Sequence, residues 1–173
     1  MVRHILQLAG GILGLSAALC SSAAAQAPPD RPQTLDSASE ACLERASQAR
    51  TARAVASLPD AIRRFQAGLG EGRRFYVTVR VWDQQGKSEQ VFVAVLGVRG
   101  DTLVGQLDSE TELVTQFHRG DRFLVLQDAV LDWTISQPDG TEEGNLLGKL
   151  MDTLQERMTR APQASICALL APR

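Results

Sequence analysis

A change of hydrophobic period after Gly72 constrains the fold of this chain more than any other feature. Beyond that glycine, every second residue is apolar, at Phe75, Val77, Val79 and Val81. Successive side chains of a strand point to opposite faces, so this run predicts a β-strand with one face in a core. The next run, residues 90–98, is apolar at nearly every position, which predicts a central strand covered on both faces.

Turn signals divide the rest of this segment into short strands. The polar stretch at 83–87 separates the first two runs, and Arg-Gly-Asp at 99–101 predicts a tight hairpin into a third strand. Gly105 within that third strand indicates a bulge or a close approach of another backbone. Two further strands are expected at 123–126 and 130–136.

Helical patterns flank the strands on both sides. Residues 36–57 contain neither Gly nor Pro and are rich in good helix formers. Pro59 is expected to end this helix, and Asp60 to cap a second one that stops at the glycines near residue 70. A last helix is expected to begin near Asn145, because apolar residues recur on one side of it at Leu146, Leu147, Leu150, Met151, Leu154 and Met158.

These elements predict an α+β fold. Five short antiparallel strands form a small sheet or an SH3-like barrel, flanked by N-terminal and C-terminal helices. We assign residues 36–70 to an N-terminal helical segment, 71–160 to the α+β domain and 161–173 to a C-terminal tail. A chain of 173 residues has room for one such domain.

The N-terminus has the three regions of a secretory signal peptide. Within residues 1–25, a basic start precedes an apolar run that ends in three alanines. The apolar run of roughly 16 residues is shorter than the about 20 that a membrane-spanning helix needs. We expect cleavage after Ala25 and a periplasmic or secreted protein, with residues 26–35 as a flexible linker. No later segment is apolar enough to span a membrane. A permanent anchor is the alternative, and Leu19 disfavours lipidation at Cys20.

Removal of the signal peptide leaves two cysteines, Cys42 and Cys167. An even number of cysteines in an oxidising compartment indicates a disulfide. This bond would close a loop of about 126 residues, for which chain entropy gives a stabilisation of roughly 5 kcal/mol, less any strain. Two buried, unpaired thiols are the alternative.

Several short motifs occur in a characteristic order between Ala52 and Leu150. A helix, AIRRFQAGL, precedes the aromatic-led strand FYVTVRV, and the segment EQVFV follows. Next come Gly105 with Leu107, Gly120-Asp121 and Asp132-Trp133. In this order and spacing the chain resembles the YegJ-like bacterial family, domain of unknown function 2314. The resemblance implies a fold and no known reaction.

The residues of these motifs favour structural roles. Gly120 is expected to take a positive φ that a side chain would disfavour. Asp132 is placed to accept backbone N–H bonds at a turn, while the indole of Trp133 covers the edge of the core. No catalytic residue is assigned from the resemblance.

Charge and residue counts exclude several classes of function. With 18 basic and 20 acidic side chains, the chain lacks the broad positive field that nucleic-acid binding needs. His118 is the only histidine after signal removal, which excludes a multi-histidine metal site and leaves no metal or cofactor expected. A triad of His118 with Ser109 and an acidic residue has no further support.

Two function classes remain. The first is a non-catalytic module that binds an unknown envelope protein or wall component through a sheet edge or a loop. The candidate binding residues in that loop are Asp108, Glu110, Glu112, His118 and Arg119. The alternative is a small cell-wall hydrolase in which Glu110 or Glu112 works with Asp132 as acid and base.

Overall fold

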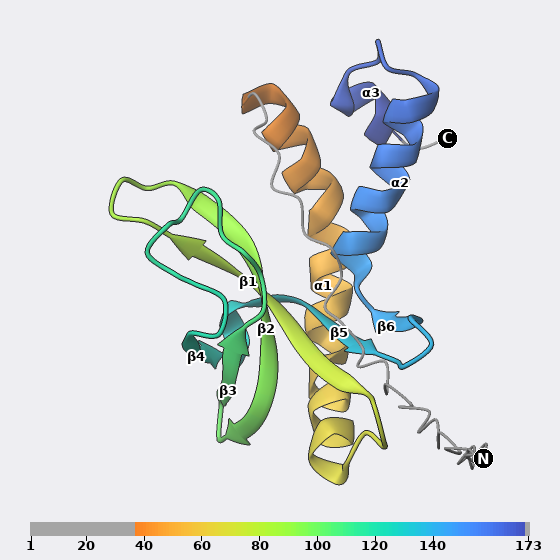
Figure 1. The fold of residues 1–173 in the computed structure, drawn as a ribbon. Helices are drawn as coiled ribbons and strands as arrows, with labels where there is room; N and C mark the ends of the chain where they lie inside the picture. Colours follow the sequence, from red (N-terminus) through yellow and green to blue (C-terminus); the bar gives the residue numbers. More distant parts are fainter. Residues whose placement is uncertain (1–36, 172–173) are drawn as a thin grey trace, which may run out of the picture.

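The computed structural model describes residues 37–171 (Figure 1), so the predicted signal peptide and linker lie outside the described residues. The helices are α1 (Ser37–Ala67), α2 (Leu146–Arg160) and α3 (Ile166–Leu170). The strands are β1 (Arg74–Trp82), β2 (Ser88–Arg99), β3 (Thr102–Leu107), β4 (Arg122–Leu126), β5 (Val130–Ser136) and β6 (Glu142–Gly144). A short 3-10 turn, Gln127–Ala129, joins β4 to β5.

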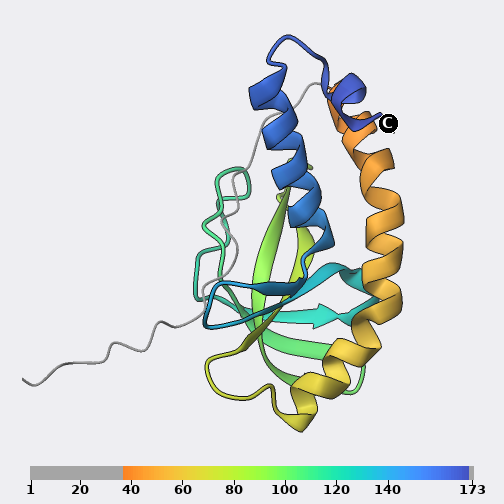
Figure 2. The ribbon, with the colours of Figure 1, turned by 90° about the vertical axis from the view of Figure 1, so that its right-hand side faces the viewer.

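The strands form one antiparallel sheet in the order β4-β3-β2-β1-β5-β6. The α+β class is confirmed, with two corrections. A sixth strand, β6, was missed because its three residues, Glu-Glu-Gly, carry no apolar alternation. The sheet is also open, so the barrel alternative is wrong. Helix α1 packs on the apolar face that a barrel would have enclosed, so the sheet buries that face without closing on itself (Figure 2).

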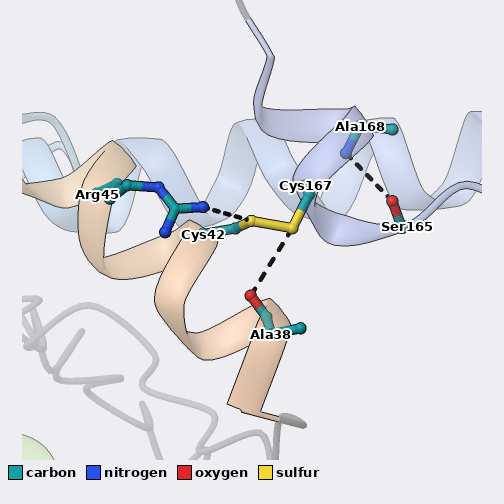
Figure 3. Close-up of a disulfide and its surroundings, with 6 residues drawn as sticks. All are labelled: Ala38, Cys42, Arg45, Ser165, Cys167 and Ala168. Carbon is teal, nitrogen blue, oxygen red and sulfur yellow. Dashed lines mark hydrogen bonds between the residues drawn. A yellow bond between two sulfur atoms is a disulfide. The ribbon is translucent and has the colours of Figure 1, made fainter.

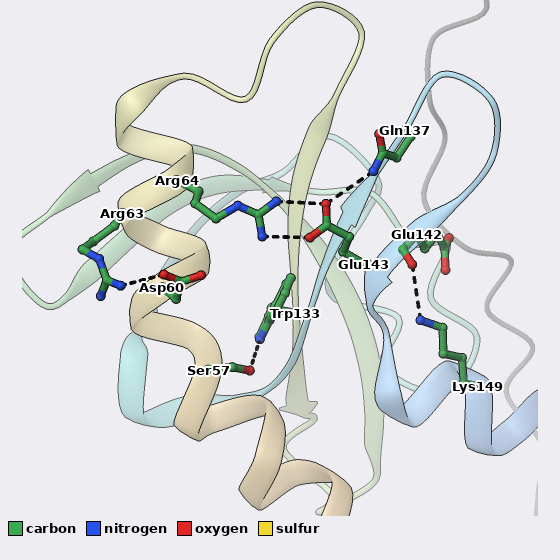
Figure 4. Close-up of polar contacts among 9 residues, drawn as sticks. All are labelled: Ser57, Asp60, Arg63, Arg64, Trp133, Gln137, Glu142, Glu143 and Lys149. Atoms are coloured by element: carbon green, nitrogen blue, oxygen red, sulfur yellow. Dashed lines mark hydrogen bonds and ion pairs between the residues drawn. The ribbon is translucent and has the colours of Figure 1, made fainter.

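Helix α1 is one continuous helix, and the expected break at Pro59 is wrong. Proline removes one backbone N–H donor from a helix. Packing of Leu58 and Ile62 into the core on either side of Pro59 holds the chain helical. Asp60, expected to cap a second helix, lies inside α1 and accepts a 2.6 Å hydrogen bond from Arg63 (Figure 4).

Contacts from α1 to the sheet fix the core. The rings of Phe65 and Phe75 lie 5.5 Å apart, centroid to centroid. The indole N–H of Trp133 donates to the Ala54 carbonyl at 3.1 Å. It also donates to the Ser57 hydroxyl at 3.0 Å (Figure 4). The predicted position of Trp133 at the margin of the core agrees with these contacts. An ion pair between Arg64 of α1 and Glu143 of β6 adds two hydrogen bonds of 2.8 and 2.9 Å.

The C-terminal helices pack beside the N-terminal half of α1 (Figures 1 and 2). Helix α2 buries Leu147, Leu150 and Leu154, three residues of the predicted apolar stripe. The segment expected to be a tail contains α3, whose Cys167 forms the predicted disulfide with Cys42 (Figure 3). The two Cα atoms of this disulfide are 5.3 Å apart, and it joins the start of α1 to the end of the described chain.

Candidate binding surface

The predicted binding residues lie in the loop of residues 108–121 between β3 and β4, which folds back along the β1–β2 hairpin (Figure 1). The loop starts as an extension of the sheet. The Asp108 N–H donates to the Phe92 carbonyl, and the Phe92 N–H donates to the Ser109 hydroxyl, both at 2.8 Å. Ser109 is buried in this contact, so its hydroxyl has a structural role and does not face a substrate.

Glu89 of β2 holds the middle of the loop. Its carboxylate accepts hydrogen bonds from the backbone N–H groups of Glu112, Leu113 and Val114 at 3.0 to 3.2 Å. Glu89 is buried, and Val114 beside it lies in the core. This role of Glu89 was not predicted from the sequence, although Glu89 begins the EQVFV motif. A buried carboxylate needs donors, but the donors of Glu89 belong to a loop more than twenty residues away, so the polar residues around it in the sequence gave no signal of this role.

Arg119 brings three of the predicted residues together. Its guanidinium donates to one oxygen of Asp108 at 3.0 and 2.6 Å, and it lies 3.9 Å from the Glu110 carboxylate. The bond to Asp108 raises the pKa of Arg119 above its usual range. This pair fixes the end of the loop against its start. The side chain of Glu112 does not join the group, since its residue contributes only a backbone N–H to Glu89.

His118 points into solvent, with 77% of its side chain exposed. Its backbone N–H donates to the Asp121 carboxylate at 2.8 Å, and its Nδ1 lies 3.8 Å from the same oxygen. Gly120 has a φ of +93°, the left-handed conformation predicted for it. Together these residues make the turn that leads into β4.

Asp132 lies inside the protein and is fully buried. One carboxylate oxygen accepts from the Trp133 N–H at 2.8 Å, and the other from the Leu147 N–H at 2.6 Å. Burial raises the pKa of Asp132, and the backbone donors oppose that rise. Asp132 therefore holds the start of α2, in the structural role predicted for it, with the first turn of a helix as its partner. Its carboxylate does not face a cleft with Glu110 or Glu112, so the geometry gives no support to acid–base hydrolysis by that pair.

Gly105 makes the close backbone approach that the sequence predicts. A Cβ at this position would collide with the Ala94 carbonyl oxygen and with Val93 Cγ1. The glycine thus lets β3 lie against β2, and so keeps β3 and β4, the two strands at this end of the strand order, in the sheet.

Strand β4 forms one edge of the described sheet (Figure 1). At either end of the β3–β4 ladder, the Gln127 N–H donates to the Asp101 carbonyl and the Leu107 N–H to the Asp121 carbonyl, each at 2.9 Å. Hydrogen-bonded pairs alternate in an antiparallel ladder. With the register of Leu103 opposite Val125, the alternation turns the backbone N–H and C=O of residues 122, 124 and 126 away from β3.

The side chains at these positions are also exposed. Leu124 is 74% exposed and Leu126 is 51% exposed. Val125, between them, is buried. We call residues 122–126, with their outward backbone groups and exposed leucines, the β4 edge. The β4 edge directly follows the loop that contains the predicted binding residues.

Comparison with protein families identifies the chain. Residues 54–166 match the family described as uncharacterized protein conserved in bacteria, DUF2314. The chain belongs to the DUF2314 family. The DUF2314 match begins within α1, includes the whole sheet and ends at the first residue of α3, so the resemblance to this domain of unknown function is confirmed. Cys42 and Cys167 both lie outside the matched DUF2314 residues. Comparisons with curated proteins and with solved structures give no match.

Two features are absent from the described part of the DUF2314 protein. Within residues 37–171, no three His, Cys, Asp or Glu side chains gather as a metal site requires. In the same residues, no helix combines the length and apolarity needed to cross a bilayer.

Proposed function

We propose that this DUF2314 protein is an exported, non-catalytic module of the cell envelope that binds an extended segment of another envelope protein. The segment adds as a strand to the β4 edge. Peptides that bind in this way gain affinity from main-chain hydrogen bonds and specificity from alternate side chains.

The observation that carries this proposal is the composition of the β4 edge. Natural sheets protect exposed edges with charges, prolines, bulges or covering segments. Here the side chains of Leu124 and Leu126 are exposed, and the backbone groups of the same two residues face away from β3. An incoming strand would satisfy those backbone groups and place its own alternate side chains beside both leucines.

Charges beside the β4 edge favour a particular kind of segment. Arg122 is exposed at the start of β4, and Arg119 lies just before it in the loop. Arg119 is already neutralised by Asp108. Arg122 thus supports a partner strand with an acidic residue at one end and apolar residues at alternate positions.

Export is supported by the disulfide and the N-terminal sequence. Disulfides persist in oxidising compartments such as the periplasm and are rare in the cytosol. The Cys42–Cys167 bond fits a protein that folds after export. Residues 1–25 supply the export signal in this proposal.

The test compares how well tagged mature wild type and the same protein carrying L124P capture envelope proteins. Proline at 124 removes an outward N–H and no β3–β4 hydrogen bond, so the strand remains while its edge is blocked. The matched control is Q84P. Gln84 is the second residue of the exposed turn whose Gly86 N–H donates to the Asp83 carbonyl at 3.2 Å, where proline is well tolerated.

We expect a partner that wild type and Q84P retain and that L124P releases. Thermal melting of all three proteins confirms that each is folded. Retention of the partner by folded L124P would contradict binding at the β4 edge. If only a second copy of this chain is retained, the edge is a self-association surface and the proposal of a different partner fails.

A further inference from the structure

A cavity of about 350 Å³ lies where β1 and β2 diverge. The two strands pair continuously from Trp82 opposite Ser88 to Tyr76 opposite Ala94, where their register ends. From there β2 continues along β3, with a register shift at Leu96, while the start of β1 continues along β5. The cavity occupies the fork between the two halves of the sheet.

The cavity has an apolar floor and a polar rim. The apolar part of its lining comes from Phe65, Phe75, Val95 and Leu107, which lie in or against the core, and from Ala94 and Leu96. Arg73, Arg74, Gln106, Asp108 and Arg119 supply the polar part. A concave site with apolar walls and a few converging polar groups is typical of small-molecule binding, and this volume is at the lower end of the usual range.

The rim has an excess of positive charge. Three arginines and one carboxylate line the cavity. Arg119 is paired with Asp108, and Arg73 lies near Glu143 and Asp139, whose pKa values it helps to lower. Arg74 is different, because within residues 37–171 its contact is a 3.4 Å hydrogen bond to the Tyr76 hydroxyl and it makes no ion pair. Arg74 is also exposed, so its guanidinium is accessible to an anionic group of a ligand.

We propose that this cavity binds a small amphiphile in which an anionic group is attached to a short apolar chain. Arg74 receives the anionic group, and Phe65, Phe75 and Val95 contact the apolar chain. A guanidinium fits both carboxylate and phosphate oxygens, so the anion belongs to either of these two classes. This site is separate from the β4 edge, and neither proposal depends on the other.

The experiment is calorimetric titration of the mature protein with octanoate and with octyl phosphate. Octanol tests the apolar chain without charge, and inorganic phosphate tests the anion without the chain. The variants are R74Q, which removes the unmatched charge, and R63Q as its control. Arg63 is an exposed arginine of α1, is paired with Asp60, and does not line the cavity.

We expect octanoate, octyl phosphate or both to bind wild type and R63Q equally, and R74Q about tenfold or more weakly. The tighter of the two ligands identifies the carboxylate or phosphate class. Octanol and inorganic phosphate should each bind far more weakly. If neither amphiphile binds, if octanol binds as well as they do, or if R63Q weakens binding as much as R74Q, the proposal is wrong.

A second variant covers loss of folding by R74Q. Leu96 lines the cavity and is 62% exposed, so L96W adds bulk at the cavity mouth without disturbing the core. We expect L96W to melt like wild type and to lose amphiphile binding. Unchanged binding by folded L96W would place the ligand elsewhere and overturn the proposal.

Discussion

At the scale of single residues, two buried carboxylates position the loop and the last long helix. Glu89 accepts three backbone N–H groups of the loop, and Asp132 accepts one at the start of α2. The Asp-Trp motif predicted a structural role for Asp132, because an aspartate at a turn can accept backbone N–H bonds. The partners of Glu89 are more than twenty residues away in sequence, so its role depends on a loop path that no local pattern encodes.

Replacing Asp132 with asparagine is expected to destabilise the protein by about 1–3 kcal/mol, because one buried N–H loses its acceptor. The pH dependence should also change. Burial raises the pKa of Asp132 above its ordinary value of 3.8, so the folded state keeps this proton to higher pH than the unfolded state. The contribution of Asp132 to the free energy of unfolding of wild type therefore decreases as pH rises from 3.8 through the folded pKa.

Urea unfolding of wild type and D132N over a series of acid to neutral pH values measures both effects. The difference in stability between the two proteins should shrink as pH rises through that window. A difference that stays constant with pH would show that Asp132 does not titrate differently in the folded and unfolded states.

At the scale of elements, apolar patterns and turn signals located five strands, but packing decided how the helices and edges formed. Pro59 is a local signal for a helix end, and the burial of Leu58 and Ile62 against the sheet overrides it. Strand β6 has no apolar pattern of its own. Its pairing with β5 and the ion pair of Glu143 with Arg64 hold it in the sheet. The position of β4 at the edge depends on strand order, which alternation alone does not specify.

Substitution of Glu89 tests how the loop before β4 is held in place. E89Q keeps the shape of the side chain and replaces one acceptor oxygen with an N–H donor, so the loop N–H groups lose part of their acceptor. We expect a loss of stability of about 1–3 kcal/mol and faster hydrogen exchange at the amides of residues 112–114. E112Q is the control, because the Glu112 side chain is exposed. Equal exchange in E89Q and wild type would contradict the assigned role.

At the scale of the whole molecule, the disulfide joins the start of α1 to α3 across nearly the full described chain. This pairing was predicted from the two cysteines that remain after the expected removal of the signal peptide and from the expected export to an oxidising compartment. The architecture that it closes was foreseen only in outline, because an open sheet under one long helix and a small barrel share the same strand pattern. The cavity between β1 and β2 was not foreseen, since it arises where two paired strands diverge.

Removing both cysteines, as C42S/C167S, is expected to lower the free energy of unfolding by about 2–5 kcal/mol while the sheet remains. Both residues lie in helices outside the sheet. Chemical unfolding followed by circular dichroism measures the loss, and reduction of wild type should reproduce it. Equal stability of the double variant and oxidised wild type would show that the disulfide does not stabilise the folded protein.

The most direct test of the proposed function is site-specific photocrosslinking in cells that export the protein. A photoreactive amino acid replaces Leu126 on the β4 edge, and in a second protein it replaces Asp152, an exposed residue of α2. We predict an adduct with another envelope protein from position 126, none from position 152, and loss of the adduct when L124P is added. No adduct from position 126, equal adducts from both positions, or adducts only with a second copy of this chain would contradict the proposal that the β4 edge binds a different envelope protein.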